Sequence, residues 1–278
     1  MKKEDILDSV VNCYEMLSKI NPLVYQITNY VAANDQANIT LAAGARPIMA
    51  EHPEEINEVI NQSDALLLNI GMLSKNKETI LLKAAQYAKE NQLPVVLDPV
   101  GIGASNLRKE LVLKILEVGN VSIIKGNIGE ILSLCNIMRD PGAISGVDYL
   151  ANSELSFENE IIETLREFSL RYKLILVITG QEDIVIGSRY MVKLINGSSL
   201  LGKITGSGCM LGSLISSYLA VCEKPFIAAV TGLSVMAISG QLAENKSSGP
   251  GSFRVHLIDE IANFNREKLL SNIKLYIT

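Results

Sequence analysis

A glycine-rich turn at residues 205–212, with the sequence Thr-Gly-Ser-Gly-Cys-Met-Leu-Gly, leads directly into a nearly uncharged stretch with helical character. Glycines leave the backbone N–H groups at a helix N-terminus free of obstruction by Cβ atoms, and such groups bind anions before any side chain acts. The turn therefore predicts a phosphate site at Gly206, Ser207 and Gly208, with Cys209 where the helix begins. A helix N-cap with flexible glycines explains the same residues, and this alternative stays open.

Polar residues follow three apolar stretches at the points where each is predicted to end as a strand. Asp98, Lys125 and Thr179 each come directly after such a stretch. Ligands of open α/β sheets bind beyond the carboxyl ends of the strands, so these side chains and the glycine-rich turn are expected to line one crevice. A lysine at the end of a buried strand favours a phosphate partner, and a solvated strand tip is the alternative.

Asp98 and Glu130 form the candidate metal site. A Mg²⁺ ion bound to nucleotide phosphates keeps several waters and needs only one or two carboxylates, so this pair suits it. Structural roles stay open for both residues. Asp98 precedes Pro99 and is also placed to cap a turn, while Glu130 lies where a helix is predicted to begin and a negative charge is favourable.

The elements that must position these residues alternate along the chain as strand and helix. Strands are expected where successive residues are apolar, because such strands are buried on both faces, and helices where the period is helical with a charged outer face. The expected strands are Ala65–Ile70, Pro94–Leu97, Val121–Ile124 and Leu174–Ile178. The expected helices are Lys75–Asn91, Asn106–Val118, Gly129–Asn136 and Phe157–Tyr172. This alternation predicts an α/β fold with three layers, α/β/α, around a mainly parallel central sheet.

The remaining segments are expected to complete a single domain over residues 1–278. Asp183–Gly187 and Tyr190–Ile195 predict a hairpin that turns at Gly187 and Ser188 and adds strands at one edge. Gly, Pro, Ser and Asp are frequent at residues 140–156, which indicates a loop or insertion.

Charge and hydropathy narrow the class of partner. The 278 residues carry a net charge of −5 without a basic cluster, which argues against nucleic acid and anionic membranes and favours small molecules. Phe226–Ala243 has no charged residue over 18 positions, but its hydroxyl, amide and glycine residues favour a buried central helix over a membrane span. The charged segment at residues 1–8 lacks the apolar run of a secretory signal, so a cytoplasmic location is expected.

Several common catalytic and binding motifs are missing from the sequence. The four cysteines, at 13, 135, 209 and 222, have no spacing typical of a metal or redox site and are interpreted as free thiols. His52 and His256 are the only histidines, and neither lies beside a serine in a nucleophile-elbow pattern. No P-loop signature occurs, and no Gly-x-Gly-x-x-Gly follows an early strand.

Four segments together carry a resemblance to a known family. They are Pro22–Val31 (PLVYQITNYV), Pro47–Glu51 (PIMAE), Asp98–Ala104 (DPVGIGA) and Thr205–Cys209 (TGSGC). In this order, and over about residues 20 to 255, the chain resembles the hydroxyethylthiazole kinases of the ribokinase-like superfamily. The resemblance implies phosphorylation, by ATP with Mg²⁺, of the hydroxyl of 4-methyl-5-(2-hydroxyethyl)thiazole, a salvage step in thiamine biosynthesis.

The same resemblance implies a role for each matching residue. Met49 and Gly206 are expected to contact the thiazole alcohol, Lys125 and Thr179 the ATP, and Asp98 and Glu130 to lie near the magnesium, with Cys209 facing the hydroxyl at the Gly206–Gly208 turn. It further implies a homotrimer with active sites at subunit boundaries, in which Asn29 and Met49 serve a neighbouring chain's pocket.

Three positions depart from the family pattern. Lys125 stands where arginine is usual, which keeps the charge but loses the planar donor geometry. Tyr25 stands where histidine is common, which leaves the local pocket lining open, and Ser207 replaces a common threonine. Most superfamily members also have an aspartate at the position of Cys209, where it takes the alcohol proton.

A cysteine is a weak candidate for that acceptor role. A free thiol has a pKa of about 8.5; the helix N-terminus would lower it, and neighbouring phosphates would raise it. We therefore expect Cys209 to be a weak or late proton acceptor and a shape determinant. A Gly206→Val change is expected to reduce turnover more than stability.

Other functions stay open from these residues. A second vitamin kinase of the same superfamily, acting on hydroxymethylpyrimidine, is the nearest alternative. A dehydratase that repairs hydrated nicotinamide cofactors and a non-catalytic regulator that binds ATP or the thiazole are the others. The cysteine at 209 and the Pro47–Glu51 segment favour the thiazole.

Overall fold

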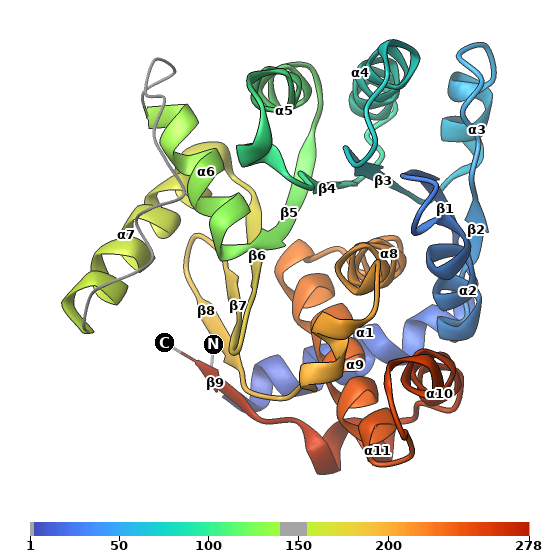
Figure 1. The fold of residues 1–278 in the computed structure, drawn as a ribbon, viewed down its shortest axis with the longest axis vertical. Coiled ribbons are helices and arrows are strands. Elements are labelled where there is room, and N and C mark those ends of the chain that lie inside the picture. The colour runs from blue at the N-terminus through green and yellow to red at the C-terminus, as the bar shows by residue number, and fades with distance from the viewer. Residues whose placement is uncertain (1–2, 140–154, 278) are drawn as a thin grey trace.

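One continuous sheet organises the molecule (Figure 1). The structure, a computed structural model, describes residues 3–139 and 155–277. In this part of the chain nine strands are ordered β2-β1-β3-β4-β5-β6-β7-β8-β9. The strands are β1 (Leu23–Ile27), β2 (Arg46–Ile48), β3 (Ala65–Asn69), β4 (Val95–Asp98), β5 (Val121–Asn127), β6 (Ile175–Thr179), β7 (Asp183–Ile186), β8 (Met191–Leu194) and β9 (Leu275–Ile277). Neighbours from β2 through β6 run parallel, and those from β6 through β9 run antiparallel.

Helices cover both faces of the sheet (Figure 1). The first face carries α1 (Lys3–Ile20), α2 (Ala33–Ala43), α8 (Ser207–Leu219), α9 (Pro225–Glu244), α10 (Pro250–Ala262) and α11 (Arg266–Asn272). The second face carries α3 (Ile56–Gln62), α4 (Lys75–Glu90), α5 (Asn106–Val118), α6 (Ile128–Arg139) and α7 (Leu155–Tyr172). Two short 3-10 segments, η1 (Ile102–Ala104) and η3 (Ser199–Lys203), lie in connections. The predicted three-layer α/β/α fold with a mainly parallel sheet is therefore confirmed.

The two hydrophobic cores follow from strand alternation. Successive side chains of a strand point to opposite faces, so Leu66 and Leu68 of β3 pack under α3 and α4 while Leu67 packs against α8. All five residues of β3 are buried. An apolar run of this kind suits a central parallel strand, where both faces are covered by helices.

Helix α9 lies in the first core. It is the one helix, among the described residues, that is long and apolar enough to cross a membrane, with a mean hydropathy of 1.7. However, 83% of that window is buried inside the protein, and the helix contacts α1, α8 and α10. The predicted buried helix at Phe226–Ala243 is confirmed.

The predicted elements are present, with some boundaries shifted. β5 does not end at Ile124 but continues through Asn127, because Lys125 still pairs in register with Val177 of β6. The ammonium of Lys125 lies beside a carboxylate of β4. Asp98 and Thr179 are likewise the last residues of their strands and do not follow them.

The hairpin and the predicted loop have separate outcomes. Strands β7 and β8 pair from Ile186↔Met191, which confirms the hairpin, but β9 covers its outer side, so the hairpin does not form the edge. The predicted loop at 140–156 lies outside the described residues except for its last two, which belong to α7. β1, β2 and β9 were not predicted as strands.

Candidate active site

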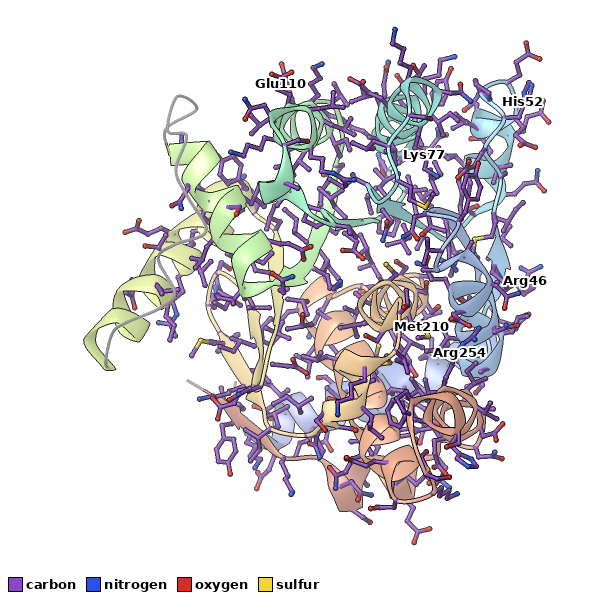
Figure 2. The ribbon with its side chains drawn as sticks, in the orientation of Figure 1. Arg46, His52, Lys77, Glu110, Met210 and Arg254 are labelled. Atoms are coloured by element: carbon purple, nitrogen blue, oxygen red, sulfur yellow. The ribbon has the colours of Figure 1, made fainter. Side chains whose placement is uncertain are left out.

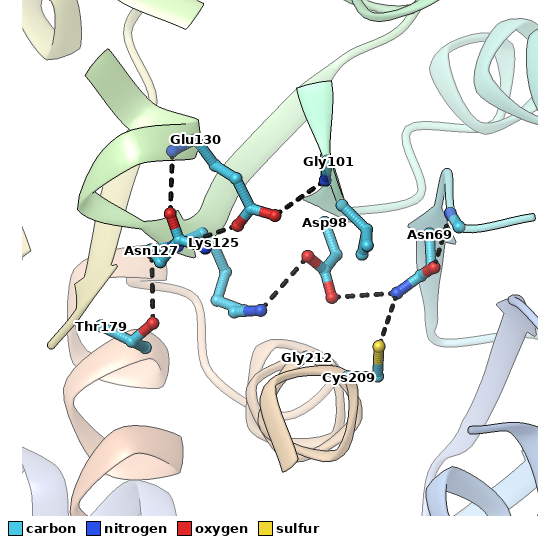
Figure 3. Close-up of polar contacts among 12 residues, drawn as sticks. Asn69, Asp98, Gly101, Lys125, Asn127, Glu130, Thr179, Cys209 and Gly212 are labelled. Atoms are coloured by element: carbon cyan, nitrogen blue, oxygen red, sulfur yellow. Dashed lines mark hydrogen bonds and ion pairs between the residues drawn. The ribbon is translucent and has the colours of Figure 1, made fainter. Parts of the chain in front are cut away.

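Polar side chains from three adjacent strands meet at the carboxyl edge of the sheet (Figure 3). Asp98 is fully buried; its Oδ1 accepts a hydrogen bond from Lys125 Nζ at 3.2 Å, and its Oδ2 accepts one from Asn69 Nδ2 at 2.9 Å. Asn69 ends β3 and lies opposite Asp98 in the parallel register. The sheet register itself therefore assembles this row.

Burial and charge oppose each other in this row. Burial raises the pKa of the Asp98 carboxyl, and nearby Glu130 raises it further, while the Lys125 ammonium acts to lower it; the net direction is upward. Burial by itself would lower the pKa of Lys125, but the neighbouring charges, Asp98 first, outweigh it and the net direction is also upward. The upward shift of the Lys125 pKa keeps this residue a cation beside Asp98.

The N-terminus of α8 faces the same row. Gly206 is its N-cap with φ +84°, and a Cβ there would lie 3.1 Å from Ala32 Cβ. A Cβ on Gly208 would lie 3.1 Å from Lys125 Nζ, so the ammonium approaches the backbone of the first turn closely. The structure changes the expectation for Gly206→Val, because left-handed backbone and a close neighbour make the substitution costly for folding as well as for turnover.

Two oriented amides face Cys209. Its Sγ accepts hydrogen bonds from Asn69 Nδ2 at 3.2 Å and from Asn29 Nδ2 at 3.5 Å. Gly71 N–H donates to Asn69 Oδ1 at 2.9 Å, and Ala32 N–H donates to Asn29 Oδ1 at 3.0 Å, which fixes each amide with its NH₂ toward the sulfur. Asn29 therefore lies against Cys209 of its own chain, and its expected role toward a neighbouring chain's pocket stays a prediction.

The Cys209 thiol is disfavoured as an anion in this setting. Burial raises its pKa and the Asp98 carboxylate raises it further, against the lowering effects of Lys125 and of the two asparagine amides. The net shift is upward, so the group is mainly a protonated thiol at neutral pH. This direction agrees with a weak acceptor.

Glu130 and Asn127 form a capping box at the start of α6. Asn127 Oδ1 accepts from the Glu130 backbone N–H at 2.9 Å, and Glu130 Oε2 accepts from the Asn127 backbone N–H at 2.9 Å. Glu130 Oε1 accepts from the backbone N–H of Gly101 at 2.8 Å. The structural role that the sequence left open for Glu130 is thus present.

A magnesium ion fits this pair of carboxylates through water. Every carboxylate oxygen of Asp98 and Glu130 accepts a protein hydrogen bond, yet each keeps a further lone pair for a metal-bound water. Within the described ranges no group of three or more His, Cys, Asp and Glu side chains forms a metal cage. Two carboxylates with waters and phosphates are the arrangement that Mg²⁺ usually takes with nucleotides.

A pocket of about 630 Å³ opens beside the first turn of α8. Polar groups and glycines line one part of it, and α9 contributes an apolar wall that includes Leu233 and Met236. The lining at the strand ends and at the helix consists of Thr179, Gly180, Asp183, Asn196, Ser207 and Gly208. Thr179 Oγ1 also donates to the carbonyl of Gly126 at 3.4 Å, which joins β6 to β5 at the pocket. This volume is in the range of pockets that hold drug-sized ligands.

Two residues of the sequence analysis lie on the opposite side of Cys209 from this pocket. Met49 is half-buried and directly follows β2, at the edge of the sheet next to β1. Tyr25 is fully buried in β1, and its hydroxyl donates to the carbonyl of Ala50 at 2.8 Å. Its effect on the site is to hold the segment that follows Met49.

Asn69 is the residue of the candidate site that the sequence analysis missed. It was included within an apolar strand expected to run to Ile70, although it is a polar residue at the end of an apolar stretch, as Asp98 is. The rule that drew attention to Asp98 applies equally to Asn69. Its central place between Asp98 and Cys209 follows only from the register of β3 against β4.

The fold and the site together define a class of protein. A mainly parallel sheet between helical layers, with a ligand-sized pocket at a glycine-rich helix N-terminus, is the arrangement of the ribokinase-like fold. The pyridoxal kinase of Staphylococcus aureus in complex with AMP-PCP and pyridoxal superimposes with a TM-score of 0.60 at 15% identity, covering 92% of this chain and 98% of that one. At that identity the likeness concerns the fold alone.

Closer matches define the family. Residues 14–267 match the family described as "HK: Hydroxyethylthiazole kinase family", and the chain belongs to it. A hydroxyethylthiazole kinase of Archaeoglobus fulgidus is 43% identical over 259 residues, 93% of this chain and 92% of that protein. The solved structure of a hydroxyethylthiazole kinase protein from Pyrococcus horikoshii OT3 has a TM-score of 0.88 at 32% identity and covers 98% of this chain and 99% of that chain.

Proposed function

We propose that this protein transfers the γ-phosphoryl group of ATP to the hydroxyl of 4-methyl-5-(2-hydroxyethyl)thiazole, the salvage step that supplies the thiazole phosphate of thiamine. Membership of the family supports the reaction. The observation that carries it is the position of the α8 N-terminus. It has a nucleotide-sized pocket on one side and, on the other, Cys209 with its partners Asn69 and Asn29.

The nucleotide belongs in the pocket that Thr179 lines. The backbone N–H groups of Gly206, Ser207 and Gly208 point from the helix N-terminus toward the transferred phosphoryl group, and the helix dipole favours its charge. Lys125 lies within reach of Gly208 and supplies a cation at the same place. These groups stabilise charge that grows on the phosphoryl oxygens, which is the largest single contribution in reactions of this type.

Asp98 and Glu130 would hold Mg²⁺ through its water ligands. When bound, the ion supplies positive charge to the phosphate oxygens and fixes their orientation. The chain's own part is to keep both carboxylates in place: Lys125 and Asn69 fix Asp98, and the backbone N–H groups of Asn127 and Gly101 fix Glu130.

The acceptor alcohol belongs on the Asn29 side of Cys209, with Met49 and Gly206 as its contacts. Cys209 faces the hydroxyl as a neutral thiol held by two amides, and it takes the proton late or weakly. A loose phosphoryl-transfer transition state requires little proton removal from the alcohol before the phosphoryl group moves. Positioning and charge neutralisation therefore account for most of the acceleration.

The remaining expectations belong to the same proposal. The chain acts as one kinase domain in the cytoplasm, as a homotrimer whose sites lie at subunit boundaries. Asn29 and Met49 are the residues through which a neighbouring chain would take part. The net charge of −5 supports small-molecule partners over nucleic acid and membranes.

One assay tests the function. The protein is incubated with Mg-ATP and either the thiazole alcohol or hydroxymethylpyrimidine, and the phosphorylated product is identified by mass spectrometry. Phosphorylation of the thiazole alcohol is expected to dominate. Product from the pyrimidine alone would assign the alternative vitamin kinase. ATP or thiazole binding without any product would indicate a regulator that lacks turnover.

A further inference from the structure

Lys77 is a buried cation that the proposed chemistry does not use (Figure 2). It lies in the first turn of α4, and its side chain is 6% exposed. Lysine is rarely buried without a partner, so its contacts indicate what it does. Its Nζ donates to the backbone carbonyl of Thr28 and to a carboxylate oxygen of Glu51.

These two contacts join segments that are separated in sequence. Thr28 belongs to the connection between β1 and α2, and Glu51 belongs to the segment after β2. Tyr30 strengthens the junction, since its hydroxyl donates to Glu51 Oε2 at 2.9 Å and its ring centroid lies 5.8 Å from Lys77 Nζ. We call Lys77, Glu51, Tyr30 and the Thr28 carbonyl the Lys77 clamp.

The clamp borders the residues that face the acceptor side of Cys209. Asn29, which donates to the Cys209 sulfur, lies between Thr28 and Tyr30, and Met49 lies two residues before Glu51. The nucleotide-sized pocket lies on the other side, at the ends of β6 and β8. An alcohol that receives the phosphoryl group must therefore approach from the clamped side.

On the basis of the proposed function, we infer that Lys77 is a positioning residue for the acceptor alcohol: it fixes the Thr28–Tyr30 segment against the Met49–Glu51 segment. Its ammonium neutralises Glu51 and satisfies a carbonyl that directly precedes Asn29. Without it, a partly buried carboxylate and that carbonyl lose their shared partner, and the two segments lose their common anchor. Among the described residues, none of the four clamp residues lines the nucleotide-sized pocket, so the effect is expected on one substrate.

Kinetics of Lys77→Met test this assignment. The KM for the thiazole alcohol is expected to rise roughly tenfold, since the walls of its site lose their registration, while the KM for ATP stays within about twofold. Lys77→Arg keeps the cation and is expected to recover most of the affinity. If Lys77→Met folds poorly, Glu51→Gln is measured in its place. It removes the carboxylate partner of Lys77 and is expected to give the same selective defect.

The ion pair between Glu78 of α4 and Lys114 of α5 offers a control outside the clamp. Glu78 pairs with Lys114 at 3.5 Å on the surface, so Lys114→Met removes an α4 ion pair outside the clamp and is expected to leave both KM values unchanged. Calorimetric titration of each variant with the thiazole alcohol and with ATP separates binding from turnover.

The outcomes separate this inference from the function on which it rests. If the unaltered protein neither binds nor phosphorylates the thiazole alcohol, the proposed function is wrong. If the unaltered protein does both, the kinetics of the variants decide. The positioning role is wrong if Lys77→Met and Glu51→Gln change the two KM values equally or not at all. A selective loss of affinity for the alcohol, recovered in Lys77→Arg, supports it.

Discussion

The two sides of the α8 N-terminus are built in different ways. On the nucleotide side, the pocket has glycines and small polar residues near the ends of β6 and β8 and an apolar wall from α9. On the acceptor side, the groups are side chains locked together: Asn29, Asn69 and Cys209 in one cluster, and the Lys77 clamp beyond it. Lys125 and Asp98 lie between the two sides.

This difference fits what each side is proposed to recognise. Phosphate groups are anions that backbone N–H groups and one cation bind well, and a glycine turn provides these without side chains. A small neutral alcohol offers few charges, so its position has to be set by rigid walls and oriented amides. The nucleotide side should therefore be sensitive to backbone geometry and charge, and the acceptor side to side-chain networks.

The largest effect is expected at the ion pair between the two sides. Lys125→Met removes the cation beside the phosphate turn and leaves Asp98 buried without its partner. We expect kcat to fall by about 10² to 10³-fold and the free energy of unfolding by about 3 kcal/mol. Denaturant unfolding and steady-state kinetics measure the two losses.

A double substitution separates these two losses. Asp98→Asn combined with Lys125→Met removes both charges and is expected to recover stability without recovering kcat. Recovery of both would mean that the pair serves folding alone.

The next effect concerns backbone geometry on the nucleotide side. Gly206→Val places a β-branched residue at φ +84° with Ala32 close by, and the expected loss is about 2 kcal/mol of stability together with about 100-fold in kcat. Gly251→Ala is the matched control, because no atom lies within 4 Å of its Cβ position. Thermal melts and kcat at a temperature where both variants are folded provide the measurement. An unchanged kcat in folded Gly206→Val would show that the turn takes no part in catalysis.

The acceptor side is tested by Cys209. Removal of a general base usually costs 10² to 10⁴-fold in rate, but a protonated thiol that acts late contributes less, so Cys209→Ala is expected to lower kcat by about tenfold. Cys209→Ser is expected to fall between Ala and the parent, since its oxygen still accepts from Asn69 and Asn29. Kinetics at saturating ATP compare them with Cys209→Asp. Activity that is abolished by Asp and intact in Ala would make a proton-acceptor role untenable.

The smallest effect is a pH dependence on the nucleotide side. Burial raises the pKa of Asp183 to about 6 from its ordinary value of 3.8, against the lowering effect of the Gly180 N–H. Folding thus favours the protonated form, so this contribution to stability is complete below about pH 4 and is lost as the pH rises through about 6.

Asp183→Asn keeps an acceptor for Gly180 and abolishes that loss. Its stability relative to the parent is expected to improve from pH 4 to pH 8 by on the order of 1–2 kcal/mol. Unfolding midpoints at the two pH values measure it. A constant difference would show that Asp183 does not titrate in this range.

The sequence predicted much of the scaffold and part of the site. The apolar runs gave four of the parallel strands, because a central strand is buried on both faces and its pattern is therefore continuous. β2 and β9 have only three residues each, too few for a recognisable pattern, and β1 contains Tyr25 and Gln26 within an otherwise apolar run. The glycine turn was recognised because its composition is local.

The partners of the site residues required the tertiary structure. Asn69 contacts a sulfur 140 residues later in the chain, and Asn29 contacts the same sulfur over 180 residues. The Lys77 clamp joins Lys77 to residues 26 and 49 positions away. Spacing in sequence carries no information about such contacts, because they depend on the order and register of strands.

By itself, the sequence determined the alternation of strands and helices, the glycine-rich turn and the family to which the chain belongs, since each of these is written in short contiguous segments. Only the tertiary structure decided that Lys125 pairs with Asp98, that Asn69 divides its amide between Asp98 and Cys209, and that Lys77 anchors the acceptor side. The physical reason is that a buried polar group must find its partner wherever the fold brings one, and strand register selects which partner that is.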